Sequence, residues 1–140
     1  MRMHTGKEWG FDIGVYRDAV MIFGITDDEK VLVIWQYAVS AQKKIYSIVA
    51  GYTDPGEMSI DTAKRELREE AGYEAKEWVV LGSVMRSKWE TGFYHLYLAE
   101  GIQKVQEQAL EDTEDIETMV MSIPELKRLI ESGKFHDVAA

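Results

Sequence analysis

Hydrophobic and polar positions along the chain predict more strands than helices. Segments rich in β-branched and aromatic residues are typical of strands, because such side chains pack well on a pleated surface. The polar stretches between them are typical of turns and loops. The expected strands are 15–25, 31–37, 45–50, 77–85, 93–99 and 116–123, with a hairpin turn at 26–30 and loops at 40–44, 86–91 and 103–115.

One segment repeats apolar residues at helical spacing and directly follows a stretch of turn residues, Gly51–Gly56. Ser59 stands where an N-cap is needed, and Gly72 stands where a left-handed C-terminal cap would end the helix. The residues that recur every three or four positions predict the buried stripe of this helix, which comprises Ile60, Ala63, Leu67 and Ala71.

A second, shorter helix is expected at 125–131. Pro124 suits the first turn of a helix, Ser122 precedes it, and Gly133 ends the pattern. Six strands interrupted by two helices predict a mixed sheet with a helix on each side, an α/β/α sandwich of the α/β (α+β) class. We expect one domain spanning 1–140, with 1–14 as an irregular arm.

Composition narrows the classes of function. The formal net charge of −9 opposes binding to DNA or RNA, although a small anionic substrate is compatible with it if the site is locally positive. No apolar run reaches the length of a membrane span, so no membrane partner is expected. The chain has no cysteine, which excludes disulfides and thiolate metal sites, and we expect a cytoplasmic location.

Acidic residues gather on the first predicted helix. At 3.6 residues per turn Glu66, Glu69 and Glu70 fall within an arc of roughly 100°. Glu66 and Glu70 are one turn apart and repel each other, and a divalent cation would remove that repulsion. The alternative is a solvated charged face on which Arg65 pairs with Glu69 and Asp61. A second acidic segment, 107–117, is expected to share one cleft with this helix.

The complete string from 51 to 73 distinguishes these alternatives. Its residues at fixed spacing resemble the Nudix hydrolase signature, and Tyr73 takes a slot that is usually aliphatic. The resemblance implies the same α/β/α fold. It also implies hydrolysis of a nucleoside diphosphate linked to another group, with Mg²⁺ or Mn²⁺ as cofactor. The matching residues are Gly51, Glu57, Arg65, Glu66, Leu67, Glu69, Glu70 and Gly72.

The resemblance also implies a role for each matching residue. Glu66 and Glu70 are similar to the main metal ligands of the family, Glu69 to a shared ligand, and the backbone carbonyl of Ala50 to a further ligand. A pyrophosphate repels an attacking oxygen, and metal ions neutralise its charge. Supporting roles, in which side chains brace or shape the loop and the helix ends, are implied for Gly51, Glu57, Arg65 and Gly72.

A general base is still required to deprotonate or orient the attacking water. In the ADP-ribose branch of the family it is a glutamate on a loop before the last strand, and in other branches it is a helix glutamate. Glu114 is therefore the first candidate and Glu111 the second, with Glu69 and Arg65 completing the candidate catalytic set. The alternative for the loop glutamates is a solvated acidic loop.

The outer parts of the chain resemble the ADP-ribose and nucleoside diphosphate sugar pyrophosphatase branch, notably V-L-V-I-W-Q-Y at 31–37. This implies cleavage of ADP-ribose or a similar nucleotide sugar into a nucleoside monophosphate and a sugar phosphate. Arg86, Lys88 and Trp89 are candidate substrate contacts, with surface packing as their alternative. Two alternatives for the function remain: the substrates are nucleoside triphosphates or dinucleotides, or the chain is a non-catalytic nucleotide-sugar sensor. A homodimer is a further open alternative for the oligomeric state.

Overall fold

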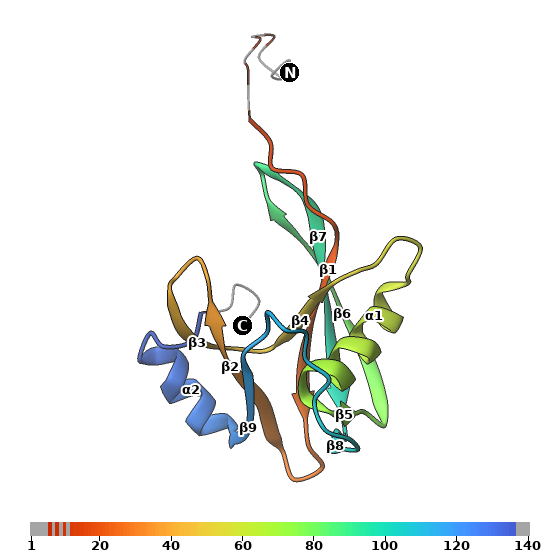
Figure 1. The fold of residues 1–140 in the computed structure, drawn as a ribbon, viewed down its shortest axis with the longest axis vertical. Helices are drawn as coiled ribbons and strands as arrows, with labels where there is room; N and C mark the ends of the chain where they lie inside the picture. Colours follow the sequence, from red (N-terminus) through yellow and green to blue (C-terminus); the bar gives the residue numbers. More distant parts are fainter. Residues whose placement is uncertain (1–5, 7, 9, 11, 137–140) are drawn as a thin grey trace.

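The computed structural model describes residues 6, 8, 10 and 12–136 of the 140-residue chain. Most of the predicted arm, at 1–5, 7, 9 and 11, therefore lies outside the described residues. Within these residues, seven strands form the main sheet, and β5 and β8 form a separate two-stranded sheet. The elements in chain order (Figure 1) are β1 Ala19–Ile25, β2 Lys30–Ala38, β3 Lys43–Ser47, β4 Val49–Tyr52, α1 Ser59–Glu66, the π-helical turn η1 Leu67–Ala71, β5 Tyr73–Glu74, β6 Glu77–Ser87, β7 Glu90–Glu100, β8 Gln103–Lys104, β9 Ile116–Ser122 and α2 Ile123–Glu131.

The sheet is mixed, as the sequence predicts, and β1 lies at its centre. One edge of β1 pairs in parallel with β7, from Ala19 opposite Tyr94 to Ile25 opposite Glu100. Its other edge is shared, because β4 pairs antiparallel with the first half of β1 whereas β2 meets it at Ile25. β2 then pairs with both β3 and β9. The sheet therefore divides between β4 and β2, and β4 leads into the loop before α1.

Two apolar layers show why a helix covers each face of the sheet. Alternate residues of a strand point to opposite faces. Val20, Ile22, Leu32 and Ile34 pack with the buried stripe Ala63, Leu67 and Ala71 of α1 and η1. Val31 and Val33 pack with Leu126 of α2 on the other face. The predicted α/β/α arrangement is confirmed.

The structure differs most from the predicted elements in the hairpin of β6 and β7. The predicted loop 86–91 is wrong, because β6 continues to Ser87 and β7 begins at Glu90. The hairpin projects beyond the rest of the sheet, and the residues before β1 run beside it (Figure 1), with Gly14 bridged to Glu90. The predicted strand 15–25 correspondingly begins only at Ala19, and the strand expected at 45–50 is interrupted at Ile48.

The helix ends differ in how well local sequence predicted them. Ser59 is not the N-cap: Met58 takes that place with an extended backbone, and the Ser59 hydroxyl instead pairs with the Tyr97 hydroxyl at 2.5 Å. Gly72 is the expected left-handed cap, with φ of 74°. Ser122 caps α2 in a reciprocal capping box with Glu125. None of the described helices has the length and apolar character to cross a bilayer.

Candidate active site

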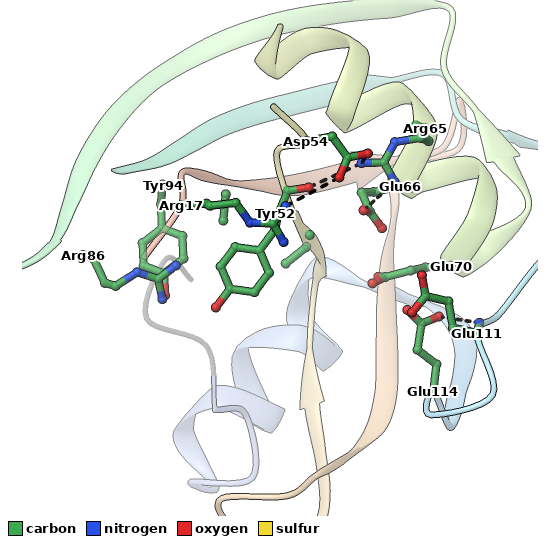
Figure 2. Close-up of a pocket in the computed structure, with 13 residues that line it drawn as sticks. Arg17, Tyr52, Asp54, Arg65, Glu66, Glu70, Arg86, Tyr94, Glu111 and Glu114 are labelled. Carbon is green, nitrogen blue, oxygen red and sulfur yellow. Dashed lines mark hydrogen bonds and ion pairs between the residues drawn. The ribbon is translucent and has the colours of Figure 1, made fainter. Parts of the chain in front are cut away.

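A cleft of about 470 Å³ opens where β4, α1, η1 and the 111–115 segment meet. Figure 2 shows Glu70, Glu111 and Glu114 together on one side of it, Arg86 and Tyr94 on the opposite side, and Tyr52 between them. The expectation that two acidic segments share one cleft is confirmed for 66–70 and 111–114. Its lining comprises Arg17, Ala19, Ala50, Gly51, Tyr52, Asp54, Arg65, Glu66, Glu70, Arg86, Tyr94, Glu111 and Glu114.

Glu66 and Glu70 line the cleft from the side of the helix, and these two residues are only 8% and 7% exposed. Their neighbour on β4 is a glycine for a steric reason. A Cβ atom on Gly51 would lie 2.2 Å from Cδ of Glu66, a distance that real Cβ atoms do not tolerate. The glycine thus lets the Glu66 carboxyl lie against the backbone of the preceding strand. The sequence spacing places both carboxylates on one face, and the fold buries them.

Burial makes these two carboxyls hard to ionise. The pKa of Glu66 is raised to about 7, chiefly by desolvation; the Arg65 guanidinium opposes this rise, whereas Glu69 and Glu114 add to it. The pKa of Glu70 is raised well above its usual value, first by burial and then by Glu66 and Glu114. Oε2 of Glu70 is buried with no hydrogen-bond partner among the described residues. Ionising both carboxyls would therefore place negative charge in the cleft that Arg65 offsets only in part, through its contact with Glu66.

Arg65 joins the loop before α1 to the acidic face of the helix. Its Nε and Nη2 atoms each donate to Glu57 at 3.0 Å, and Nη1 donates to Glu66 at 2.9 Å and to Glu69 at 3.1 Å. The Arg65 hydrogen bonds, followed by that from Thr62, lower the pKa of Glu57 to about 2. This bidentate pair is the kind of contact that fixes the position of neighbouring side chains.

The residues at the acidic end fit a divalent cation. Carboxylate oxygens are the ligands that Mg²⁺ prefers, and an unpartnered buried oxygen on Glu70 is a group that such an ion would satisfy. Across the described part of the chain, no three acidic or imidazole side chains already converge as a metal cluster. Arg65 Nη1 instead lies against Glu66 and Glu69. Glu69 lies outside the cleft lining, whereas Ala50 lines it.

The segment that carries Glu111 and Glu114 is docked on the end of the helix. The last carbonyl groups of a helix have no partner within it, and η1 receives its partners from this segment. The Ala109 amide donates to the Glu69 carbonyl at 2.8 Å, and Nε2 of Gln108 donates to the Glu70 carbonyl at 2.6 Å. The docking thus places the segment's glutamates beside Glu70. Within it, the Glu111 amide donates to Oε2 of Glu114 at 3.2 Å.

The opposite end of the cleft is cationic and aromatic. The guanidinium of Arg86 lies over the rings of Tyr16, Tyr52 and Tyr94, and its Nη1 atom donates to the Tyr94 hydroxyl at 2.7 Å. Lys88 and Trp89, the other two candidate substrate contacts, do not line the cleft. They stand at the turn of the β6–β7 hairpin, where Lys88 lies over the Trp89 ring.

Sequence reasoning missed several residues that line this cleft. Tyr94 lies on β7, where an aromatic residue is unremarkable, and its position beside Arg86 depends on pairing between the two strands. Arg17 precedes β1 and pairs with Asp54 of the loop before α1 at 3.6 Å. Spacing along the chain does not identify these neighbours, because each contact depends on strand pairing or on a loop packing against another segment. The missed residues are Arg17, Ala19, Tyr52, Asp54 and Tyr94.

Comparisons with known proteins agree with the geometry. The family model described as NUDIX domain matches residues 15–138. An ADP-ribose pyrophosphatase of Bacillus subtilis (strain 168) is 29% identical over 139 residues, which cover 98% of this chain and 75% of that protein. A methanol dehydrogenase activator of Bacillus methanolicus is 31% identical over 122 residues, 85% of this chain and 65% of that protein.

Among solved structures, one titled as the crystal structure of an ADP compounds hydrolase has the same fold. It superposes with a TM-score of 0.78, covers 90% of this chain and 68% of that chain, and shares 24% sequence identity. The family match extends over nearly the whole described chain and includes the helix that carries the acidic face. The chain therefore belongs to the NUDIX domain family and is a Nudix pyrophosphohydrolase related to ADP-ribose pyrophosphatases.

Proposed function

We propose that this chain hydrolyses, with a divalent metal, the pyrophosphate bond of a nucleoside diphosphate linked to another group, and that ADP-ribose or a similar nucleotide sugar is its substrate. The products are a nucleoside monophosphate and a sugar phosphate. The observation that carries the proposal is the pair of buried carboxylates, Glu66 and Glu70, facing a cleft large enough for a small ligand. Two neighbouring buried carboxylates are costly to ionise, Arg65 contacts only Glu66 of the pair, and a divalent metal ion supplies the further positive charge.

Glu66 and Glu70 would hold Mg²⁺ or Mn²⁺, with Glu69 and the carbonyl of Ala50 as further ligands. When bound, such an ion neutralises the diphosphate and draws electron density from phosphorus. Glu57 and Arg65 hold the loop against the helix through their paired hydrogen bonds. Gly51 leaves room for the Glu66 carboxyl, and Gly72 turns the chain after η1.

Glu114 is our proposed general base, with Glu111 as the alternative. Both carboxyls line the cleft on the side of Glu70. In this role the carboxylate accepts a proton from the water as the water oxygen attacks phosphorus. The phosphate oxygen that leaves takes up a proton, so the products carry the elements of one water molecule. Glu69 and Arg65 complete the proposed catalytic set through their direct contact with each other.

We propose that Lys88 and Trp89 contact a part of the substrate that extends beyond the cleft along the hairpin.

We also propose a homodimer. It is supported by exposed apolar residues on the edge strand β6, where Val80 is 71% exposed, Leu81 56% and Met85 61%. Unpaired edge strands with apolar side chains favour pairing with another chain. We likewise propose that residues 1–140 form a single domain and that the protein is cytoplasmic.

A substrate panel with MgCl₂ or MnCl₂ tests the reaction. ADP-ribose, ADP-glucose, a dinucleoside diphosphate and a nucleoside triphosphate are incubated with the chain, and products are separated by chromatography and mass spectrometry. The proposal expects AMP and ribose 5-phosphate from ADP-ribose, and no product in EDTA. Release of pyrophosphate from the triphosphate alone would instead identify a triphosphate hydrolase. Tight binding of ADP-ribose without turnover would identify a sensor.

A further inference from the structure

The arginine at the cationic end of the cleft is held in an unusual setting. Arg86 lies at the end of β6, and its guanidinium carbon is 4.8 Å from the centre of the Tyr16 ring, 4.6 Å from Tyr94 and 5.5 Å from Tyr52. The three rings come from the segment before β1, from β7 and from β4. We call Tyr16, Tyr52 and Tyr94 the tyrosine cage. Aromatic faces attract a cation and restrict its rotamers.

The charge of Arg86 is not balanced in the way that the other two cations of the cleft are. Arg17 pairs with Asp54, and Arg65 pairs with carboxylates of the helix and the preceding loop. Among the described residues Arg86 forms no ion pair with a carboxylate. Its Nη1 atom donates to the Tyr94 hydroxyl, while Nε and Nη2 are buried with no acceptor among the residues that the structure describes.

An unpaired guanidinium at a cleft wall is costly unless something else supplies the negative charge. Burying an ion without a counter-ion costs free energy, and cation–π contacts offset only part of that cost. The acidic side chains of the cleft lie on the opposite side, as Figure 2 shows, so they do not neutralise Arg86. The cleft therefore has a negative end suited to a metal ion and a positive end suited to an anion.

We infer that Arg86, held by the tyrosine cage, forms an anion subsite for a phosphate group of the ligand, separate from the carboxylate end of the cleft. Guanidinium groups bind phosphate oxygens with charge-assisted hydrogen bonds. The assignment of this anion as a phosphate of the reacting substrate rests on the proposed function. The subsite itself rests only on the unbalanced charge and on its position in the cleft. Arg86 would make the chain selective for ligands that carry a phosphate over the corresponding nucleosides.

Ligand binding without metal tests this inference. In EDTA, the dissociation constants of AMP and of uncharged adenosine are measured by calorimetry or NMR titration for the unmodified chain and for Arg86→Met. The unmodified chain is expected to bind AMP more tightly than adenosine. Arg86→Met is expected to weaken AMP binding about 10- to 100-fold, as loss of a charge-assisted contact does, and to leave adenosine unchanged. Arg86→Lys keeps the charge and is expected to recover part of the AMP affinity.

Arg128→Met removes an exposed arginine from α2, outside the cleft, and is the matched control. Equal AMP affinity in Arg86→Met and Arg128→Met would overturn the subsite, as would failure of the unmodified chain to prefer AMP. If circular dichroism shows that Arg86→Met is not folded, the AMP affinity of Tyr94→Phe becomes the test of the subsite. That variant keeps the ring and frees Nη1, so AMP affinity must be retained or increased, and a loss contradicts the inference.

The same variants separate this inference from the proposed function. If the unmodified chain cleaves no nucleotide but its preference for AMP depends on Arg86, the subsite stands and the hydrolase proposal fails. If ADP-ribose is cleaved with the same KM in Arg86→Met as in the unmodified chain, the hydrolase proposal stands and the subsite fails. A rise in KM of about tenfold or more, with a much smaller change in kcat, supports both.

Discussion

Nε2 of Gln108 donates to the backbone carbonyl of Glu70 at 2.6 Å, and its second proton goes to the carbonyl of Ile116 at 3.0 Å. One side chain therefore joins the helix that carries the buried carboxylates to the start of β9. Between these two anchor points lies the segment that carries Glu111 and Glu114. The spacing between the helix carboxylates and the candidate bases depends on this amide.

Gln108→Leu removes both hydrogen bonds while keeping a side chain of similar size. Two part-buried carbonyl groups lose a donor, so the free energy of unfolding is expected to fall by about 1–3 kcal/mol. We expect kcat to fall about tenfold or more with little change in KM, because the base shifts while substrate contacts persist. Gln106→Ala is the control, since Gln106 contacts the Arg68 carbonyl only at 3.5 Å. Equal kinetics in the two variants would contradict the positioning role.

Glu70→Gln keeps the shape of a buried side chain but removes its charge. We expect kcat to fall by orders of magnitude, because Glu70 is a proposed metal ligand, while the circular dichroism spectrum stays unchanged. The exposed Glu131→Gln on α2 is the control. Steady-state kinetics with Mg²⁺ and a metal titration measure the two effects. Turnover equal to that of the control would remove Glu70 from the metal site.

Glu114→Gln and Glu111→Gln distinguish the two candidate bases. The true base is expected to lower kcat by about 10²- to 10⁴-fold, the range typical of general base catalysis, and to change metal affinity far less. The other substitution is expected to have a small effect. Rates measured across pH, together with Mg²⁺ binding, give the comparison. If both variants turn over normally, the base lies elsewhere, and Glu69 is the next residue to substitute.

Stability without metal should depend on pH with a definite sign. The pKa of Glu66 is about 7 in the folded chain, above its usual value of 4.5, so the folded state retains a proton that the unfolded state has lost. The contribution of Glu66 to the stability of the fold is therefore fully present below about pH 4.5 and is lost as the pH rises toward 7. Glu57 has the opposite sign, because its pKa is lowered to about 2 and its stabilisation is lost as pH falls from 4.5 toward 2.

Melting temperatures in EDTA, measured from pH 5 to 8, test this dependence. We expect Tm to decrease over that range in EDTA and the decrease to shrink in saturating Mg²⁺, because a bound cation compensates the ionised carboxylates. Glu66→Gln is the control for other titrating groups and should have a flatter profile than the unmodified chain. A Tm in EDTA that does not change between pH 5 and 8 would contradict a buried carboxyl with a raised pKa at this position.

The hairpin and the helix start show where local reasoning failed. Ser59 has the chemistry of an N-cap, but its hydroxyl pairs with Tyr97 of β7, a residue that the chain brings alongside only after folding. The predicted loop 86–91 became strand because β6 and β7 extend each other's pairing almost to the turn. Secondary-structure propensity depends on neighbours along the chain, whereas the role of Ser59 and the extent of β6 and β7 depend on partners across the sheet.

The sequence by itself determined the features that repeat over a few residues. Helical spacing put Glu66 and Glu70 on one face and Ala63, Leu67 and Ala71 on the buried stripe, and Gly72 ended the helix, because one helical turn sets these relationships. The tertiary structure alone decided that both carboxylates are buried, that Gln108 ties a distant segment to them, and that three tyrosines surround Arg86. Each of these contacts joins different strands or loops, so its distance is set by sheet register and packing rather than by spacing along the chain.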